Sequence, residues 1–542
     1  MKIEGNIVDV VNEDIFPAEI DIRGNRILEI KKVNKNFNRF ILPGFVDAHI
    51  HIESSMLCPS RFAEVVIPHG TVSVIADAHE IANVMGIEGI LFMIEDSKNT
   101  PLKAFFTAPS CVPATPFETN GGTISEKEVE KLFELEKVVA LGEVMNYEAV
   151  INGEKEMIAK IEIAKKYGKV IDGHAPLLSG KKLETYISYG ITTDHESVSY
   201  EEAKEKAKLG MKIMIREGSN AKNMKDLINL IKEGYETFLV SDDILVSDLI
   251  KGHLDRLLSS AVELGIDPVK AIKCVTVNPV KHYRIPVGLL RKGDYADLII
   301  VNNLKEFRVI EVYIEGKLVA KDGKATFNVR PKSTGNTLIA KPLELNMIKI
   351  RGEGKKQKVN VIGIIPDQIV TDHLIEELET KDGYLESDQE KDILKIIVYE
   401  RYGHGNLSIG FVKGFGFKNC ALASTIAHDS HNIVCAGSSN DLIVKAVNNL
   451  IEKGGGVCAV DKSNVEILPL PIAGLMSNEE ANIVSENIEK IHEFLALHEC
   501  RLTNPIITLS FMTLLVIPKL KISDRGLFDV EKQEFIPLLV SK

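Results

Sequence analysis

Residues 40–53 read FILPGFVDAHIHIE, an apolar run whose last part alternates polar and apolar residues. Side chains along a strand alternate between its two faces, so Asp47, His49 and His51 share one face. Two neutral imidazoles at adjacent positions of that face can chelate one divalent ion. An H-x-H pair is common, and two ordinary polar strand residues are the alternative. The stretch therefore predicts a strand whose end is a candidate metal site.

Seven further apolar runs follow, and an amphipathic helical pattern separates each run from the next. They lie at residues 71–80, 102–110, 137–144, 169–175, 190–196, 211–218 and 237–243. Strict alternation of strands and helices implies a parallel sheet, and eight such units have the size of a (β/α)₈ barrel. An open doubly wound sheet would carry a G-x-G-x-x-G turn after its first strand, and none is present. We therefore predict an α/β fold with a TIM-like barrel over residues 41–285.

Short strand patterns flank the predicted barrel on both sides. We expect residues 1–40 and 286–340 to complete one small β-sandwich-like domain, with the barrel inserted between its halves. Residues 345–542 mix further strand and helix patterns and are long enough for a core of their own. They predict a C-terminal α+β domain.

Composition excludes several classes of protein. The chain has 542 residues and a net charge of −12, which argues against a general nucleic-acid-binding surface. Its longest apolar run, residues 511–518, is far shorter than the roughly 20 residues of a membrane helix. The N-terminal stretch carries acids where a signal peptide would be apolar, so we expect a cytoplasmic protein. The 7 cysteines form no C-x-x-C pair, which argues against disulfides and zinc knuckles.

Histidines and acids gather where the predicted strands end. The strand ends read Asp47-Ala-His49-Ile-His51, Asp77-Ala-His79-Glu80, Gly142-Glu143, Asp172-Gly-His174, Asp194-His195-Glu196 and Asp242-Asp243. A TIM barrel places its active site at this rim. Imidazoles and carboxylates suit Zn²⁺, Mn²⁺ or Fe²⁺. The ring offers more ligands than one catalytic metal uses, and it fits two ions that share a hydroxide.

The same segments resemble a known family. The run PGFVDAHIHIESSM, with single histidines after the fifth and sixth strands and an aspartate after the eighth, is similar to the amidohydrolase superfamily. The segments ADAHEIANVMG, GEVMNYEAVI, IREGSNA, AHDSHNIVCAG and LPLPIAGLMS resemble the adenine deaminase family within it. The resemblance extends from about residue 42 to residue 475 and includes the C-terminal region.

The resemblance implies a set of metal ligands and a pair of divalent ions, Mn²⁺ or Fe²⁺ first and Zn²⁺ as an alternative. The implied ligands are His49, His51, Glu143, His174, His195 and Asp242. Many amidohydrolases use a carboxylated lysine after the fourth strand, but here that strand ends in Glu143. Its only lysine, Lys137, lies at the opposite end. This departure agrees with the adenine deaminase pattern.

The implied reaction is hydrolysis of adenine to hypoxanthine and ammonia by a metal-bound hydroxide, in purine salvage. Asp242 would take the hydroxide proton and return it to the leaving amine. Glu80 and Asp77 are the candidate acids for the ring nitrogen, and ligation of a further ion is the other role for this segment. Glu217, which could instead pair with Arg216, is a candidate purine contact. Ser110 and Cys111 at the end of the third strand could also line the base pocket.

Other interpretations remain open. One alternative function is hydrolysis of a cyclic amide, and another is a catalytically silent barrel whose C-terminal region binds a partner. His428 and His431 have a metal-like composition, but we favour a polar turn or a packing network. We interpret Glu118 as a solvated loop acid, with contact to the substrate as the alternative. A small-molecule purine, no nucleic acid, no membrane and a homo-oligomer, with a dimer favoured, complete the expected partners.

Overall fold

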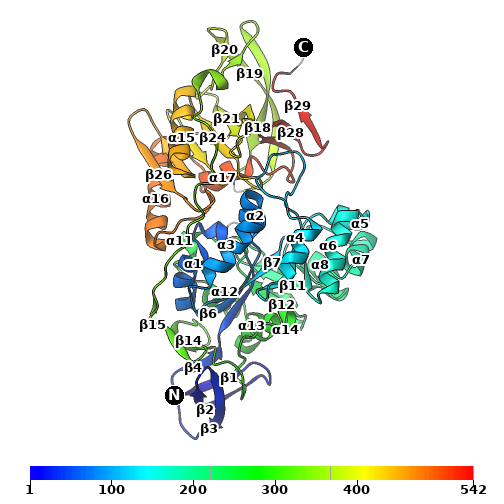
Figure 1. Cartoon of the computed structure of the whole chain (residues 1–542), viewed down its shortest axis with the longest axis vertical. Coiled ribbons are helices and arrows are strands. Elements are labelled where there is room, and N and C mark those ends of the chain that lie inside the picture. The colour runs from blue at the N-terminus through cyan, green and yellow to red at the C-terminus, as the bar shows by residue number, and fades with distance from the viewer. Residues whose placement is uncertain (220, 367, 541–542) are drawn as a thin grey trace. The chain divides into compact units, whose positions relative to one another are not determined.

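The computed structural model describes residues 1–219, 221–366 and 368–540. The chain divides into two compact units, coloured along the chain in Figure 1. The first unit comprises Met1–His79, Ile90–Cys111 and Ile124–Lys332. The second comprises Glu80–Gly89, Val112–Thr123 and Ser333–Lys542.

Eight parallel strands in the first unit form a closed ring. They are β5 (Phe45–Ile50), β6 (Thr71–Ala76), β7 (Lys103–Ala108), β8 (Val138–Val144), β9 (Val170–Gly173), β10 (Thr193–Asp194), β11 (Lys212–Arg216) and β12 (Thr237–Val240). Strands β5 to β9 and β10 to β12 pair in chain order. The Thr192 N–H donates to the Ile171 carbonyl at 2.9 Å and joins β9 to β10. The Asp242 N–H donates to the His49 carbonyl at 3.1 Å and closes the ring, so the predicted (β/α)₈ barrel is confirmed.

The run at residues 40–53 is divided between two sheets. Phe40–Pro43 forms β4 of a neighbouring sheet, and β5 begins at Phe45. Gly44 separates them, and a Cβ at this position would lie 2.4 Å from the Val72 side chain. The close approach of β6 therefore requires glycine at the point where the chain enters the barrel.

Helices connect the barrel strands and follow the last of them. They are α1 (Pro59–Val66), α2 (His79–Met85), α3 (Ile87–Ser97), α4 (Glu126–Phe133), α5 (Tyr147–Ile151), α6 (Lys155–Lys166), α7 (Gly180–Ser188), α8 (Tyr200–Lys208), α9 (Met224–Leu227), α10 (Asn229–Lys232), α11 (Val246–Leu249), α12 (Leu254–Glu263), α13 (Pro268–Cys274) and α14 (Val277–Tyr283). Every residue of β5, β6, β7 and β12 is buried. Strands covered on both faces in this way are typical of a parallel α/β sheet.

Both flanks of the barrel contribute strands to one sheet. Its eight strands are ordered β16-β15-β14-β13-β4-β1-β2-β3. Their bounds are β1 (Lys2–Asp9), β2 (Asp14–Arg23), β3 (Arg26–Lys32), β13 (Leu298–Val301), β14 (Val309–Ile314), β15 (Lys317–Lys321) and β16 (Lys324–Ala325). Apolar side chains from the two flanks, such as Ile7, Ile41 and Leu298, form one core. The domain limits at residues 40 and 286 stay predictions.

A ten-stranded sheet dominates the second unit. Its order is β17-β20-β19-β18-β22-β21-β24-β23-β25-β26. These strands are β17 (Ile350–Arg351), β18 (Lys356–Ile364), β19 (Thr371–Lys381), β20 (Tyr384–Leu385), β21 (Ile393–Tyr399), β22 (Leu407–Lys413), β23 (Ala421–Ser424), β24 (Ile433–Gly437), β25 (Gly456–Val460) and β26 (Val465–Pro469). The helices are α15 (Asn440–Lys453), α16 (Ala481–Leu497) and α17 (Pro505–Phe511), and β27 (Leu520–Ser523), β28 (Gly526–Asp529) and β29 (Glu534–Ile536) form a small further sheet.

Two segments that follow barrel strands belong to the second unit. The second of them, Val112–Thr123, is held by polar contacts: the Thr119 N–H donates to Asp524 Oδ1 at 2.9 Å, and Asn432 Nδ2 donates to the Thr119 carbonyl at 2.8 Å. Glu118 in this segment is 5% exposed, so the interpretation of a solvated loop acid is wrong. The tertiary contacts of the C-terminal region, which the local sequence does not reveal, bury it.

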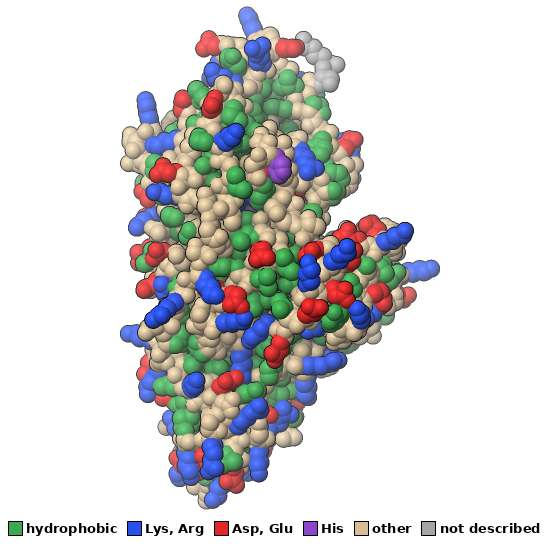
Figure 2. All heavy atoms as spheres, viewed as in Figure 1, with side chains coloured by type: hydrophobic (Ala, Val, Ile, Leu, Met, Phe, Trp, Pro, Cys, Tyr) green, Lys and Arg blue, Asp and Glu red, His purple; other side chains and the backbone are tan. Residues whose placement is uncertain are grey.

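Acidic, basic and hydrophobic side chains are interspersed over the face shown in Figure 2. Among the described residues, no helix is both long and apolar enough to span a bilayer.

Candidate active site

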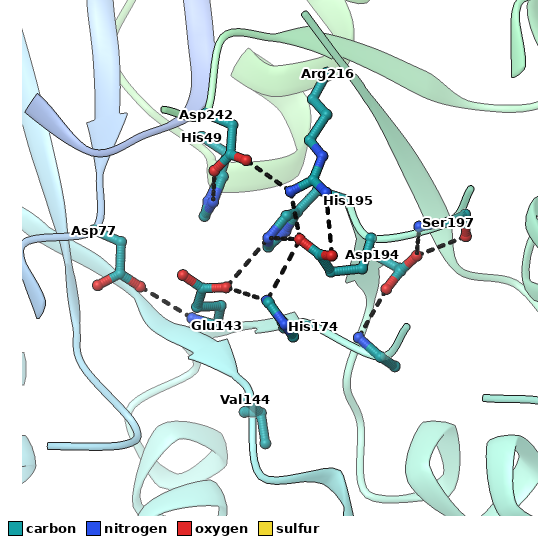
Figure 3. Close-up of polar contacts among 12 residues, drawn as sticks. His49, Asp77, Glu143, Val144, His174, Asp194, His195, Ser197, Arg216 and Asp242 are labelled. Atoms are coloured by element: carbon teal, nitrogen blue, oxygen red, sulfur yellow. Dashed lines mark hydrogen bonds and ion pairs between the residues drawn. The ribbon is translucent and has the colours of Figure 1, made fainter. Parts of the chain in front are cut away.

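The carboxyl ends of the barrel strands bring the six predicted metal ligands together. Figure 3 shows His49, Glu143, His174, His195 and Asp242 of this set. Their ligand atoms lie within 4.8 Å of one another in three overlapping groups. The groups are His49, His51 and Glu143; His49, His195 and Asp242; and Glu143, His174 and His195. All six are buried except His174, whose side chain is 26% exposed. Residues from five strand ends therefore form one cluster.

Glu143 lies at the centre of this cluster. Its Oε1 is 3.3 Å from His51 Nε2, while its Oε2 is 2.6 Å from His174 Nδ1 and 3.2 Å from His195 Nε2. Each carboxylate oxygen thus faces different imidazoles. Burial raises the pKa of Glu143, but the charges and hydrogen bonds of His174 and His195 outweigh it and hold the pKa well below its usual value.

A glycine makes room for the residue that orients Glu143. A Cβ on Gly142 would lie 2.2 Å from Asp77 Oδ2. Without it, Asp77 Oδ2 accepts the Glu143 N–H at 3.0 Å. The pairing of β8 with β9 is irregular between Leu141 and Val144, next to this contact. Register shifts of this kind often redirect a side chain beside an active site.

Asp242 faces His49 near the end of β5 and His51 just after it. Its Oδ1 lies 3.3 Å from both His49 Nε2 and His51 Nε2, and its Oδ2 accepts a bond from Arg216 Nη1 at 2.8 Å. The backbone is left-handed with φ of 56°, a conformation that aspartate tolerates better than most residues. Burial raises the pKa of Asp242, but Arg216 and the imidazoles hold it well below its usual value.

The tautomer of His51 follows from the contact of its other nitrogen. His51 Nδ1 lies 3.0 Å from the backbone carbonyl of Asp77. A carbonyl only accepts hydrogen bonds, so Nδ1 carries the proton and Nε2 presents its lone pair to the cluster. This arrangement of a ligand imidazole and a backbone acceptor is common at metal sites.

The cluster fits divalent metal ions. His49 Nε2 is buried, and its 3.3 Å contact with Asp242 Oδ1 lacks the geometry of a hydrogen bond, which is costly unless another ligand satisfies the nitrogen. Burial lowers the pKa of His174, yet Glu196 and Glu143 outweigh it and raise the pKa to about 9. Four imidazoles and two ionised carboxylates match the ligand preference of Zn²⁺, Mn²⁺ and Fe²⁺.

An ion pair that the sequence analysis did not predict lies beside the cluster. Arg216 at the end of β11 contacts Glu196 through Nη1 and Nη2, with an Nη2–Oε2 distance of 3.1 Å. Its Nη1 also donates a hydrogen bond to Asp242. The alternative that Glu217 pairs with Arg216 is wrong. The Glu217 Oε1 instead accepts the Met224 N–H at 3.1 Å. Adjacent strand residues point to opposite faces, and this alternation could have revealed the difference.

The three predicted substrate contacts lie in different environments. Ser110 Oγ donates to the Glu143 carbonyl at 2.5 Å, so its hydroxyl braces the strand that carries Glu143. Cys111 Sγ is 3.2 Å from Ser110 Oγ, and burial raises the pKa of its thiol. Burial also raises the pKa of the Glu217 carboxyl. Their contact with substrate stays a prediction.

The two predicted acids belong to different units. Asp77 Oδ1 lies 3.4 Å from His79 Nδ1. Burial raises the pKa of Asp77, but His79 and His51 together hold it below its usual value. Glu80, the next residue along the chain, lies in the second unit and contacts His428 and His431. The structure thus groups Glu80 with a histidine pair more than 340 positions away.

Comparisons with known proteins identify the family of this chain. Residues 40–319 match the amidohydrolase family, and residues 368–534 match the adenine deaminase C-terminal domain. The chain is 49% identical to an adenine deaminase from Methanothermobacter thermautotrophicus and 48% identical to one from Methanosphaera stadtmanae, each match covering 99% of both chains. A β-aspartyl dipeptidase structure from Fervidobacterium islandicum AW-1 aligns with a TM-score of 0.48 and 17% identity, over 60% of this chain and 99% of the other. The chain belongs to the adenine deaminase family of the amidohydrolases.

Proposed function

We propose that this protein hydrolyses adenine to hypoxanthine and ammonia at the barrel cluster, with two divalent ions. Relatives that match the whole chain at 49% and 48% identity are adenine deaminases. The observation that carries the proposal is the place of Glu143, whose two oxygens face different imidazoles. Glu143 would therefore help to hold both ions, and a metal pair would supply an activated water as the nucleophile.

The residues divide into two half-sites around Glu143. His49, His51 and Asp242 would hold one ion, and His174 and His195 the other. The family resemblance favours Mn²⁺ or Fe²⁺, and imidazole and carboxylate ligands also suit Zn²⁺. Bound ions of this kind lower the pKa of water and so supply the nucleophile.

Asp242 is the proposed proton carrier. The Arg216 bond at 2.8 Å keeps its carboxylate ionised and fixed in direction, so it is ready to accept a proton. It would take that proton from the attacking water and return it to the amine that leaves. The contact of Arg216 with Glu196 in turn fixes the guanidinium.

The ring nitrogen of the purine needs a proton as water adds to the neighbouring carbon. Asp77 suits this role poorly because its Oδ2 accepts the Glu143 N–H and its Oδ1 faces His79. We therefore assign the role to Glu80, which is bonded in sequence to His79. Glu217, the residue after β11, is the proposed purine contact. The engaged hydroxyl of Ser110 and the buried thiol of Cys111 favour roles in the pocket wall.

Metal reconstitution tests the proposal directly. Apoprotein reloaded with Mn²⁺ should bind two ions per chain and release ammonia from adenine. Dihydrouracil is the matched substrate for the cyclic amide alternative, which Glu143 in place of a lysine disfavours. Turnover of dihydrouracil alone, or less than one ion per chain without any turnover, would refute adenine deamination and favour the hydrolase or the silent barrel.

The cellular setting stays a prediction. A role in purine salvage, a cytoplasmic location and a homodimer are consistent with a small-molecule deaminase. Sedimentation of the metal-loaded protein would test the dimer.

A further inference from the structure

His174 and His195 lie on opposite sides of a break in the barrel sheet. His174 follows β9, an edge strand of the five-stranded sheet, and His195 follows β10, an edge strand of the three-stranded sheet. Strand β10 is only 2 residues long. His49 and His51, in contrast, belong to one continuous segment, so the chain itself fixes their spacing. The spacing of His174 and His195 depends on contacts between two separate segments.

Asp194 bridges these two segments. Its Oδ1 accepts the Ala175 N–H at 2.9 Å, and Ala175 directly follows His174. Its Oδ2 accepts the Ser197 N–H at 3.1 Å and the Ser197 hydroxyl at 2.7 Å (Figure 3). Asp194 itself directly precedes His195. One carboxylate therefore ties the backbone beside one histidine to the backbone beside the other.

Glu202, in the first turn of α8, repeats this pattern one step further from the strands. Its Oε1 accepts the Leu177 N–H at 2.8 Å, and its Oε2 accepts the Val198 N–H at 3.2 Å. Leu177 lies in the segment after β9, and Val198 lies in the segment after β10. The two segments are thus bridged twice, each time by a carboxylate that accepts one backbone N–H from each side.

Lys206 joins the two carboxylates, and its side chain is 0% exposed. Its ammonium donates to Asp194 Oδ2 at 2.9 Å and to Glu202 Oε1 at 2.8 Å. It also donates to the Ala175 carbonyl at 2.6 Å and to Ser197 Oγ at 3.1 Å, so it contacts both segments directly. Removal of one partner from a buried ion pair leaves an uncompensated charge. The ammonium therefore holds both carboxylates in place.

The two histidines need such support more than the other ligands do. His174 Nδ1 and His195 Nε2 face the same oxygen of Glu143, at 2.6 Å and 3.2 Å. The side chain of His174 is 26% exposed, the largest value among the six ligand candidates, so packing restrains it least. Residues behind a metal ligand that fix its orientation are part of a metal site.

We propose that Lys206, Asp194 and Glu202 form a clamp of positioning residues that sets the spacing of His174 and His195 and so retains the ion of that half-site. The inference rests on the proposed function, because it requires two ions at the barrel cluster. All five residues lie in the first unit. The clamp gives the two ions an unequal dependence on Lys206: the ion held by His174 and His195 needs it, and the other ion does not.

Titration of the apoprotein with Mn²⁺, followed by the EPR signal of free Mn²⁺, measures both affinities without turnover. Lys206→Met keeps an unbranched side chain but removes the charge and its hydrogen bonds. One of the two ions should then bind about 10–100-fold more weakly, the usual cost of losing a contact that orients a metal ligand. Excess Mn²⁺ should restore kcat, because the clamp contacts neither the ions nor the substrate. Parent affinities for both ions in Lys206→Met would overturn the clamp.

Lys103→Met is the matched control. Lys103 is a buried lysine of the same unit, and it donates to Asp297 Oδ2 at 2.7 Å and to the Pro286 carbonyl at 3.0 Å. It is the first residue of β7, so it lies at the end of the barrel opposite to the metal ligands. Lys103→Met should lower the thermal midpoint and leave both Mn²⁺ affinities unchanged. Equal weakening of Mn²⁺ binding in the two lysine variants would show a general loss of stability and would overturn the clamp.

Two further variants identify the half-site and cover a failure to fold. In His174→Ala the remaining ion should bind equally well with and without Lys206→Met, and weaker binding in the double variant would overturn the selectivity. Glu202→Gln keeps the pair of Lys206 and Asp194 but loses one oxygen that accepts a backbone N–H. It should weaken the same ion by a smaller factor. Unchanged affinities in a folded Glu202→Gln protein would also overturn the clamp.

The parent protein separates this inference from the proposed function. If the parent binds two ions and deaminates adenine while Lys206→Met retains both affinities, the clamp alone is wrong. If the parent binds less than one ion per chain and releases no ammonia, the proposed function is wrong, and the inference fails with it.

Discussion

The cluster at the barrel rim and the Glu80 cluster are built from the same residue types, yet they suit opposite chemistry. At the barrel rim, His51 Nδ1 faces a carbonyl oxygen, so its Nε2 offers a lone pair. In the second cluster, His431 Nδ1 faces an amide N–H, so its Nε2 offers a proton. The atom behind each ring decides whether the imidazole is a metal ligand or a hydrogen-bond donor. A count of histidines and acids does not distinguish the two.

Loss of the central carboxylate should have the largest effect. Glu143→Gln removes the only group whose oxygens face both sets of imidazoles within the barrel cluster. We expect loss of the metal pair and a fall in activity below detection. Metal analysis after Mn²⁺ reconstitution, together with ammonia release, checks both results.

The matched variant in the other cluster is Glu80→Gln. It should retain two ions per chain while kcat falls about 10²–10⁴-fold, the usual range for a lost general acid or base. Loss of a metal ion from Glu80→Gln would show that the second cluster is also a metal site, and the comparison of tautomers would then fail.

Asp242→Asn should be of comparable severity. The amide keeps the shape of the side chain but removes the basic oxygen that takes up a proton. We expect a loss of at least about 10³-fold in kcat with little change in the thermal midpoint. Residual activity within tenfold of the parent would contradict the proton-carrier role.

Removal of the Arg216 charge should have a smaller effect that depends on pH. Arg216 lowers the pKa of Asp242, whose ionised form is the active one, so activity is lost as pH falls through that pKa. In Arg216→Gln the pKa should rise, and the acid limb of kcat should move to higher pH, with the largest loss at acidic pH and little loss near neutrality. Arg216→Lys keeps the positive charge, but one ammonium group cannot reproduce the separate Nη1 and Nη2 contacts with Asp242 and Glu196. An unchanged acid limb in Arg216→Gln would exclude this electrostatic control.

The sequence predicted the barrel, and its strand ends placed histidines and acids at one rim because parallel strands end there. The family resemblance then selected the six ligand candidates among them. The sequence did not predict contacts that depend on distant segments. Arg216 is the last residue of β11, whereas Glu196 follows β10. Glu80 and His431 are 351 positions apart. Nothing in one sequence shows such pairs, nor which nitrogen of a histidine carries the proton. The burial of Glu118 was hidden for the same reason, since its neighbour Asp429 lies in the C-terminal region.

The smallest expected effect on activity concerns Glu118. Unlike Glu143 and Asp242, this buried acid is less stable in its ionised form. Burial and the nearby Asp429 raise its pKa to about 8, and its Oε2 has no hydrogen-bond partner among the described atoms. An acid with a raised pKa in the folded state stabilises the fold below its unfolded pKa of about 4.3, and this contribution is lost as pH rises toward 8. The parent should therefore lose roughly 2–5 kcal/mol from this group between pH 5 and pH 8.5. Glu118→Gln cannot ionise, so its thermal midpoint should fall less over that range, with unchanged kcat at pH 7. Equal pH dependence in both proteins would mean that Glu118 is ionised in the fold, which would place a cation or water beside it.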